Sequence, residues 1–104
     1  MSLVDGKTKR RLRFIALKLI YEQHEKQRHR YDDVTLMSVL RRLNYDVYLD
    51  LMRAVLQDLK ERKLIDYEHS KDLTSGKFSI FKIEVRPPGR DLVEANEDNV
   101  FAEI

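Results

Sequence analysis

The fold is decided by the run Leu56-Gln57-Asp58-Leu59-Lys60-Glu61-Arg62-Lys63-Leu64-Ile65 and by the later run Arg86-Pro87-Pro88-Gly89-Arg90-Asp91-Leu92-Val93-Glu94. The first run closes a predicted helix and the second opens another. Between them, Leu64 to Glu68 predicts a strand, and residues 70–76 predict a turn-rich loop. Phe78 to Val85, rich in aromatic and β-branched residues, predicts a returning strand. The predicted order is therefore helix, hairpin, helix.

The returning strand changes its apolar alternation between Ile80 and Phe81. A strand with one face on the core has a period of two, so the change predicts either a bulge or a twist. Lys71 and Lys77 flank the loop of this hairpin. They can reach a nucleic-acid backbone or minor groove, although an exposed hairpin tip is polar in most proteins.

A first helix is predicted from about Thr8 to His29, since no Gly or Pro interrupts this segment. One of its faces has the spacing of a core-facing helix and consists of Leu12, Ile15, Ala16, Leu19 and Ile20. A second apolar row, Phe14, Leu17 and Tyr21, lies roughly opposite. A lone two-layer domain does not need both rows. Either the C-terminal segment folds back over the second row, or another chain covers it.

Two more helices are predicted in the middle of the chain. Thr35 is the expected N-cap of a short helix with Arg41 and Arg42 at its exposed end. The turn Asn44-Tyr45-Asp46 follows, because Asn tolerates a left-handed backbone and Asp46 can accept hydrogen bonds from the next helix. That helix is predicted from about Val47 to Lys63.

The exposed side of this third predicted helix carries Asp50, Arg53, Ala54, Gln57, Lys60 and Glu61. Facing a major groove, Arg53 could pair with guanine and Gln57 with adenine. Asp46 and Asp50, however, bring negative charge to the end of the helix that enters the groove, where it repels phosphates unless Asp50 accepts from a cytosine amine. The alternative is a solvent face of mixed charge stabilised by intrahelical pairs.

The net charge is only +2, but its distribution is uneven. Residues 1–30 hold nine Lys or Arg against three acids, whereas residues 90–104 hold Arg90 against five acids. The basic set Lys7, Lys9, Arg10, Arg11 and Arg13 either meets phosphates or forms a solvated helix end.

Length and composition set further limits. A chain of 104 residues without cysteine predicts one domain, with no disulfide framework and no thiolate zinc site. No run is apolar enough for a signal peptide or a membrane span, so we expect a cytoplasmic protein without a membrane anchor. The three glycines form no phosphate loop, and His24 and His29 lack ligand spacing. We expect no catalytic residue, cofactor or metal.

A family resemblance follows from Leu56, Leu59, Leu64 and Ile65, then a hairpin, then Pro88-Gly89-Arg90 with Leu92 and Val93. This order resembles the winged helix-turn-helix superfamily of small prokaryotic and viral regulators, over about residues 8–95. In that superfamily the residue before the Leu-Ile pair is often Gly, and this chain has Lys63 there.

The resemblance implies an α+β fold, with a three-helix core, a C-terminal β-hairpin wing and a short final helix. This winged-helix domain spans residues 8–95, between a flexible N-terminus at 1–7 and an acidic tail at 96–104. The implied recognition helix begins at Val47 and turns Asp50, Arg53, Ala54 and Gln57 toward bases, while the wing residues are Lys71 and Lys77.

The implied function is transcription regulation through double-stranded DNA. The residues expected at DNA are Arg41, Arg42, Tyr45, Asp50, Arg53, Ala54, Gln57, Lys60, Lys71 and Lys77. Long first helices pair in many regulators of this architecture, so we expect a homodimer whose interface includes Phe14, Leu17 and Tyr21. Since fold alone does not imply function, the alternative is a protein-interaction module without DNA binding. Its surface would add Val100, Phe101 and Ile104.

Overall fold

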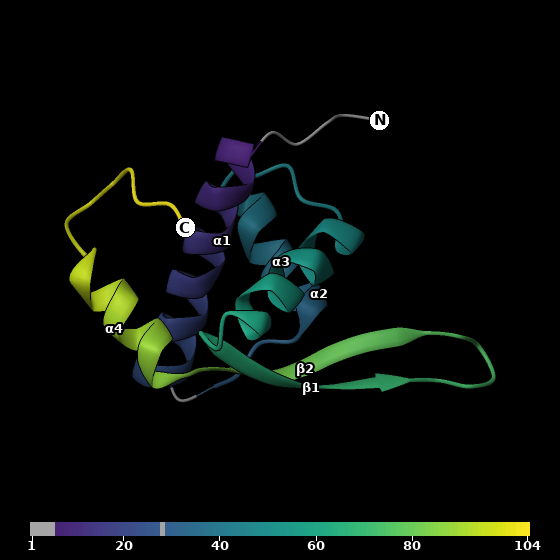
Figure 1. Cartoon of the computed structure of the whole chain (residues 1–104). Coiled ribbons are helices and arrows are strands. Elements are labelled where there is room, and N and C mark those ends of the chain that lie inside the picture. Colours follow the sequence, from purple (N-terminus) through teal and green to yellow (C-terminus); the bar gives the residue numbers. More distant parts are fainter. Residues whose placement is uncertain (1–5, 28) are drawn as a thin grey trace.

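The computed structural model describes residues 6–27 and 29–104, which form an α+β structure (Figure 1). Within these residues the elements are the helices α1 Gly6–Tyr21, α2 Asp33–Arg42, α3 Leu49–Glu61 and α4 Pro87–Ala95, and the antiparallel strands β1 Ile65–Lys71 and β2 Phe78–Val85. The predicted order of helix, hairpin and helix is confirmed. Of the N-terminal segment predicted to be flexible, residues 1–5 lie outside the described residues, and Gly6 already belongs to α1.

Helix α1 lies between α4 on one side and α2 with α3 on the other, and the hairpin crosses the ends of the helices and projects beyond α3 (Figure 1). The core forms where α1, α2, α3 and the base of the hairpin meet. Its largest fully buried side chains are Leu17, Ile20, Leu36, Leu40, Met52, Leu56, Leu59, Ile65, Ile80, Ile83, Val47 and Val93.

The second apolar row of α1 is covered by the chain's own C-terminal segment. Phe14 is 2 % exposed and Leu17 is 0 % exposed, with α4 packed alongside α1. The tail continues this cover, because the backbone N–H of Ile104 donates to the Arg10 carbonyl at 3.0 Å. Phe14 and Leu17, expected at an interface with another chain, are therefore buried inside this one. Tyr21 is half-buried, and its hydroxyl lies 3.3 Å from a carboxylate oxygen of Glu94 on α4.

The helix ends differ from the predicted ones by a few residues. The α-helical part of α1 ends at Tyr21, and a π-helical turn, η1 Glu22–Lys26, continues it. Helix α2 is capped by Asp32, whose Oδ1 accepts from the Thr35 N–H at 2.7 Å, so Thr35 is the donor and not the cap. Helix α3 begins at Leu49, and no side chain caps it.

Strand β2 contains a bulge, one of the two alternatives predicted from its alternation. Asp66 pairs with Glu84 and Glu68 with Phe81, so β2 has one more residue than β1 in this interval. Lys82, inside the interval, has a left-handed φ of 53°. The extra residue changes the parity of the strand. Both Ile80 and Ile83 can therefore face the core.

Two close approaches fix the base of the hairpin. The backbone N–H of Ile83 donates to the Tyr31 carbonyl at 3.1 Å, which ties the α1–α2 connection to β2. The Arg86 N–H donates to the Leu64 carbonyl at 2.9 Å, and α4 then passes so close that a Cβ on Gly89 would lie 2.2 Å from the same oxygen. Gly89 is needed for this approach.

Candidate nucleic-acid interface

A groove of about 420 Å³ lies between α3 and the inner face of the hairpin. We call it the α3–hairpin groove. Its α3 wall consists of Arg53, Gln57, Lys60 and Glu61, and its hairpin wall consists of Tyr67, His69, Phe78 and Ile80. Three residues expected at DNA, Arg53, Gln57 and Lys60, therefore lie together in one concave surface.

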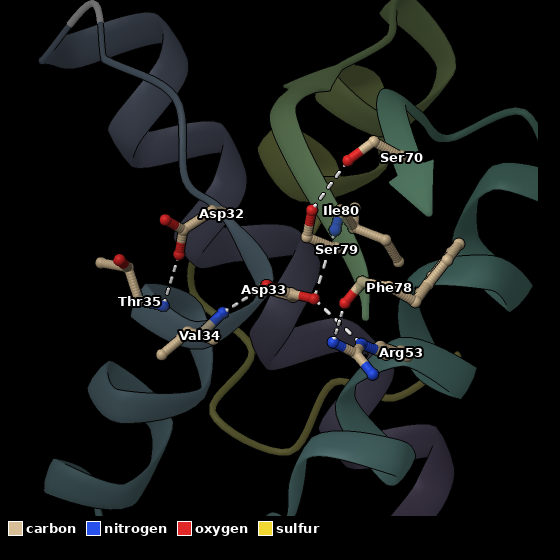
Figure 2. A network of polar contacts seen from close by, with 9 residues as sticks. All are labelled: Asp32, Asp33, Val34, Thr35, Arg53, Ser70, Phe78, Ser79 and Ile80. Atoms are coloured by element: carbon tan, nitrogen blue, oxygen red, sulfur yellow. Dashed lines mark hydrogen bonds and ion pairs between the residues drawn. The ribbon is translucent and has the colours of Figure 1, made fainter. Parts of the chain in front are cut away.

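Arg53 is held by a buried carboxylate at the start of α2 (Figure 2). Its Nε lies 3.0 Å from Oδ2 of Asp33, which is only 2 % exposed. The same Oδ2 accepts from the backbone N–H of Ile80 at 3.2 Å, and Oδ1 accepts from the Val34 N–H at 2.8 Å. Asp33 therefore joins α2, α3 and β2 at one point.

The other contacts of Arg53 are with Phe78. The guanidinium donates to the Phe78 carbonyl, and its Cζ lies 5.3 Å from the centroid of the Phe78 ring. Two of its donors are thus occupied by the protein, and only 24 % of the side chain is exposed. These bonds hold the guanidinium against the hairpin and leave three of its five N–H groups for other partners. The geometry gives Arg53 a positioning role between α3 and the hairpin.

Lys60 joins the other end of α3 to the hairpin. Its Nζ lies 3.4 Å from a carboxylate oxygen of Asp66, 3.3 Å from the Tyr67 carbonyl, and 4.3 Å from the centroid of the Tyr67 ring. The hydrogen bond from the Tyr67 backbone N–H is the main cause that holds the pKa of Asp66 below its usual value, and Lys60 lowers this pKa further. The pKa of the Tyr67 phenol is raised, mainly because the phenol is buried.

The remaining exposed residues of α3 are less constrained. The amide Nε2 of Gln57 lies 3.3 Å from Oε1 of Glu61, an intrahelical pair on the surface. Such pairs contribute a few tenths of a kcal/mol, so a ligand can replace them. Asp50 and Ala54 are exposed on the same helix. One intrahelical pair on this face is therefore present, between the neutral amide of Gln57 and the carboxylate of Glu61.

The wing lysines lie at the projecting end of the hairpin. Lys71 ends β1 and Lys77 directly precedes β2, and both are exposed. In residues 6–27 and 29–104 no ion pair is found for either. The loop between them is ordered by its own hydrogen bonds, because Asp72 N–H donates to the Lys77 carbonyl and Gly76 N–H to the Asp72 carbonyl, each at 2.7 Å.

Arg41, Arg42 and Tyr45 are not brought to the groove. Helix α2 starts beside β2 at Asp33, so its far end is about 15 Å away along the helix axis. There the Nε of Arg41 donates to the Val47 carbonyl at 2.7 Å, which stabilises the turn into α3. Asn44 has the expected left-handed backbone, with φ of 69°. Tyr45 is half-buried against the core.

The basic end of α1 is occupied by the C-terminal tail. Arg10 forms an ion pair with Glu103 at 3.1 Å, Arg11 donates to the Ala102 carbonyl at 2.7 Å, and Arg13 donates to the Ile104 carbonyl at 2.9 Å. These arginines hold the tail against α1. They are therefore less available to phosphates than an exposed helix end would be.

The sequence did not indicate Asp33 as part of the site. An acidic residue in the first turn of a helix is common, because it complements the positive end of the helix dipole. Asp33 has this position, and nothing in its local sequence distinguishes it from an exposed helix-start carboxylate. Its partners lie 20 and 47 positions further along the chain.

No model of a known protein family matches this chain, and no curated protein matches its sequence. In the described part of the chain, no helix is long and apolar enough to cross a membrane. Among the same residues, no group of three or more His, Cys, Asp or Glu side chains is placed to hold a metal ion. The α3–hairpin groove and the residues around it are therefore the candidate site.

Proposed function

We propose that this chain is a cytoplasmic winged-helix protein that binds duplex DNA and regulates transcription. The observation that carries the proposal is the contact of Arg53 with both Asp33 and Phe78, which fixes α3 against the hairpin. In this proposal the exposed face of α3 and the wing lysines, at the projecting end of the hairpin, contact the same duplex. Placed on a duplex, α3 would enter the major groove and the wing would follow the backbone.

In this proposal the roles are divided between reading and anchoring. Gln57 is the base-reading residue, since its amide pairs with the two adjacent groups of adenine once the weak bond to Glu61 is released. Lys71 and Lys77 anchor phosphates, which gives affinity without sequence preference. Asp50 favours cytosine as the DNA base that it faces, because the cytosine amine can donate a hydrogen bond to its carboxylate.

The experiment that tests the proposal is the binding of a random duplex to the whole chain over a series of salt concentrations. Phosphate anchoring makes the logarithm of the binding constant fall linearly with the logarithm of the salt concentration. No binding of any duplex at low salt would contradict the proposal. The oligomeric state is measured on the same sample, because the expected homodimer must pair through a surface other than the buried Phe14 and Leu17.

A second candidate is a protein-interaction module, and it is favoured by the tail. Val100 is 69 % exposed and Phe101 is 83 % exposed, next to Ala102, which is buried. An apolar pair held outward by an anchored tail is a suitable contact for another protein. Phe101→Ser would then abolish association detected by analytical ultracentrifugation.

A further inference from the structure

We propose that the α3–hairpin groove binds a nucleotide that carries a 5′ phosphate. This site does not depend on the proposed duplex binding, because it concerns a single unpaired nucleotide. Its volume of about 420 Å³ suits a ligand of mononucleotide size. A row of rings, the polar groups that face them and the lysines of the wing support this ligand.

Three rings form a row on the hairpin wall of the groove. The centroids of Tyr67 and His69 are 6.5 Å apart, and those of His69 and Phe78 are 5.8 Å apart. Lys60 lies over the ring of Tyr67, and Arg53 lies over the ring of Phe78. His69, in the middle of the row, is exposed, whereas Tyr67 and Phe78 are half-buried and each has a cation over its ring. His69 is therefore the ring on which a base would stack.

The polar groups of the groove complement the edge of a base. Gln57 offers an amide donor and acceptor, and Glu61 offers a carboxylate. Their mutual bond of 3.3 Å is long and exposed, so a ligand can exchange it. Lys60 and Arg53 have N–H groups beyond those used by their protein partners. Buried Ile80 supplies an apolar floor, so the site combines one apolar face with mixed donors and acceptors.

The phosphate would lie toward the tip of the hairpin. Lys71 is on the same face of β1 as His69, two residues or about 7 Å further along the strand, and it pairs with Phe78 in the register. Lys77 directly precedes Phe78. A base on His69 thus places its sugar beside Phe78 and its phosphate near Lys71, for which no ion pair is found in the described residues, with Lys77 close by in the chain at the hairpin tip. The positive charge at the hairpin tip matches the phosphate of a nucleotide, and the rings in the middle of the groove match its base.

The test follows backbone amide signals of the whole chain by NMR while adenosine 5′-monophosphate (AMP) is added. We expect saturable shifts at Gln57, His69 and Phe78, with a Kd of about 1 mM or tighter. His69→Ala should weaken binding at least about tenfold, because it removes the stacking ring. The control His29→Ala changes an exposed histidine outside the groove and should leave the Kd unchanged.

Three further titrations separate the sources of binding. Adenosine without phosphate should shift the same amides with a weaker Kd, and a five-nucleotide single strand of deoxyadenosine shows whether an unpaired strand is preferred to free AMP. Either preference agrees with the proposal. It is overturned if AMP gives no saturable shift at these amides, or if inorganic phosphate alone reproduces the AMP shifts. Neither result bears on duplex binding, which is measured separately.

Discussion

Arg53 on α3 and Asp33 at the start of α2 form an ion pair of 3.0 Å, and the carboxylate is almost completely buried. This pair determines how α3 is placed against the hairpin, because the same two residues also contact the backbone of Ile80 and Phe78. It thereby connects the folding of the core with the geometry of the proposed binding surface.

Removing one member of this pair should destabilise the fold strongly. We expect Arg53→Ala to lower the free energy of unfolding by about 3–5 kcal/mol, since it leaves the Asp33 carboxylate buried without its counter-charge. The double variant Asp33→Ala/Arg53→Ala should lose less than the sum of the two single variants. Urea denaturation measures all three. Strictly additive losses would show that the pair does not act as a unit.

The matched control is a surface ion pair on the same hairpin. Lys82 and Glu68 lie 3.4 Å apart, and their side chains are 59 % and 60 % exposed. Solvent screens such a pair, so Glu68→Gln should change the free energy of unfolding by less than about 1 kcal/mol.

Lys63→Gly should stabilise the protein. Lys63 has a left-handed φ of 63°. The strain of a side chain there is about 1–2 kcal/mol, and the greater freedom of Gly in the unfolded chain offsets part of it. A net gain of about 0.5–1 kcal/mol is expected from the urea midpoint. Lys63→Ala keeps the Cβ and should give no such gain, so an equal gain in both variants would exclude backbone strain as the cause.

Gly89→Ala should destabilise the contact between α4 and the hairpin. The added Cβ would lie 2.2 Å from the Leu64 carbonyl oxygen, so the backbone would have to move. The expected loss is about 1–3 kcal/mol. Gly6→Ala is the control, because its Cβ would meet only the flexible end of Arg10, at 3.3 Å. If Gly89→Ala and the parent unfold at the same temperature, the close approach of Gly89 to the Leu64 carbonyl is contradicted.

Stability should fall at alkaline pH. Burial raises the pKa of the Tyr31 and Tyr67 phenols above their usual value near 10. The folded state therefore favours the neutral phenols, and this contribution is fully present below pH 10 and is lost as pH rises toward the folded-state pKa. Tyr67→Phe should flatten the fall of the urea midpoint above about pH 10. An unchanged pH profile would show that Tyr67 does not contribute to it.

Much of the fold could be predicted from the sequence because it depends on local patterns. The bounds of β2, the left-handed Asn44 and the altered alternation in the returning strand all follow from neighbouring residues. The cover over Phe14 could not be decided in this way, because an apolar row shows that something packs on it and not what does. In the structure the chain's own α4 and tail supply it.

The candidate site was predictable only in part. Helical spacing correctly placed Gln57, Lys60 and Arg53 on one side of α3. It could not show that Arg53 is occupied, because the partner carboxylate of Asp33 comes from another helix and is brought there by the tertiary fold. Arg53 was predicted to read a base, and in the structure two of its donors are bonded to Asp33 and Phe78.

The most direct test of the central claim compares duplex binding of the parent with that of Lys71→Ala/Lys77→Ala by fluorescence anisotropy over a salt series. If both lysines anchor phosphates, the variant binds every duplex more weakly, and the slope of log K against log salt becomes shallower by about 1.8. Lys82→Ala, on the same hairpin, is the control and should keep the parent's slope. Absence of duplex binding by the parent at low salt, or equal slopes for all three proteins, would contradict the proposed surface.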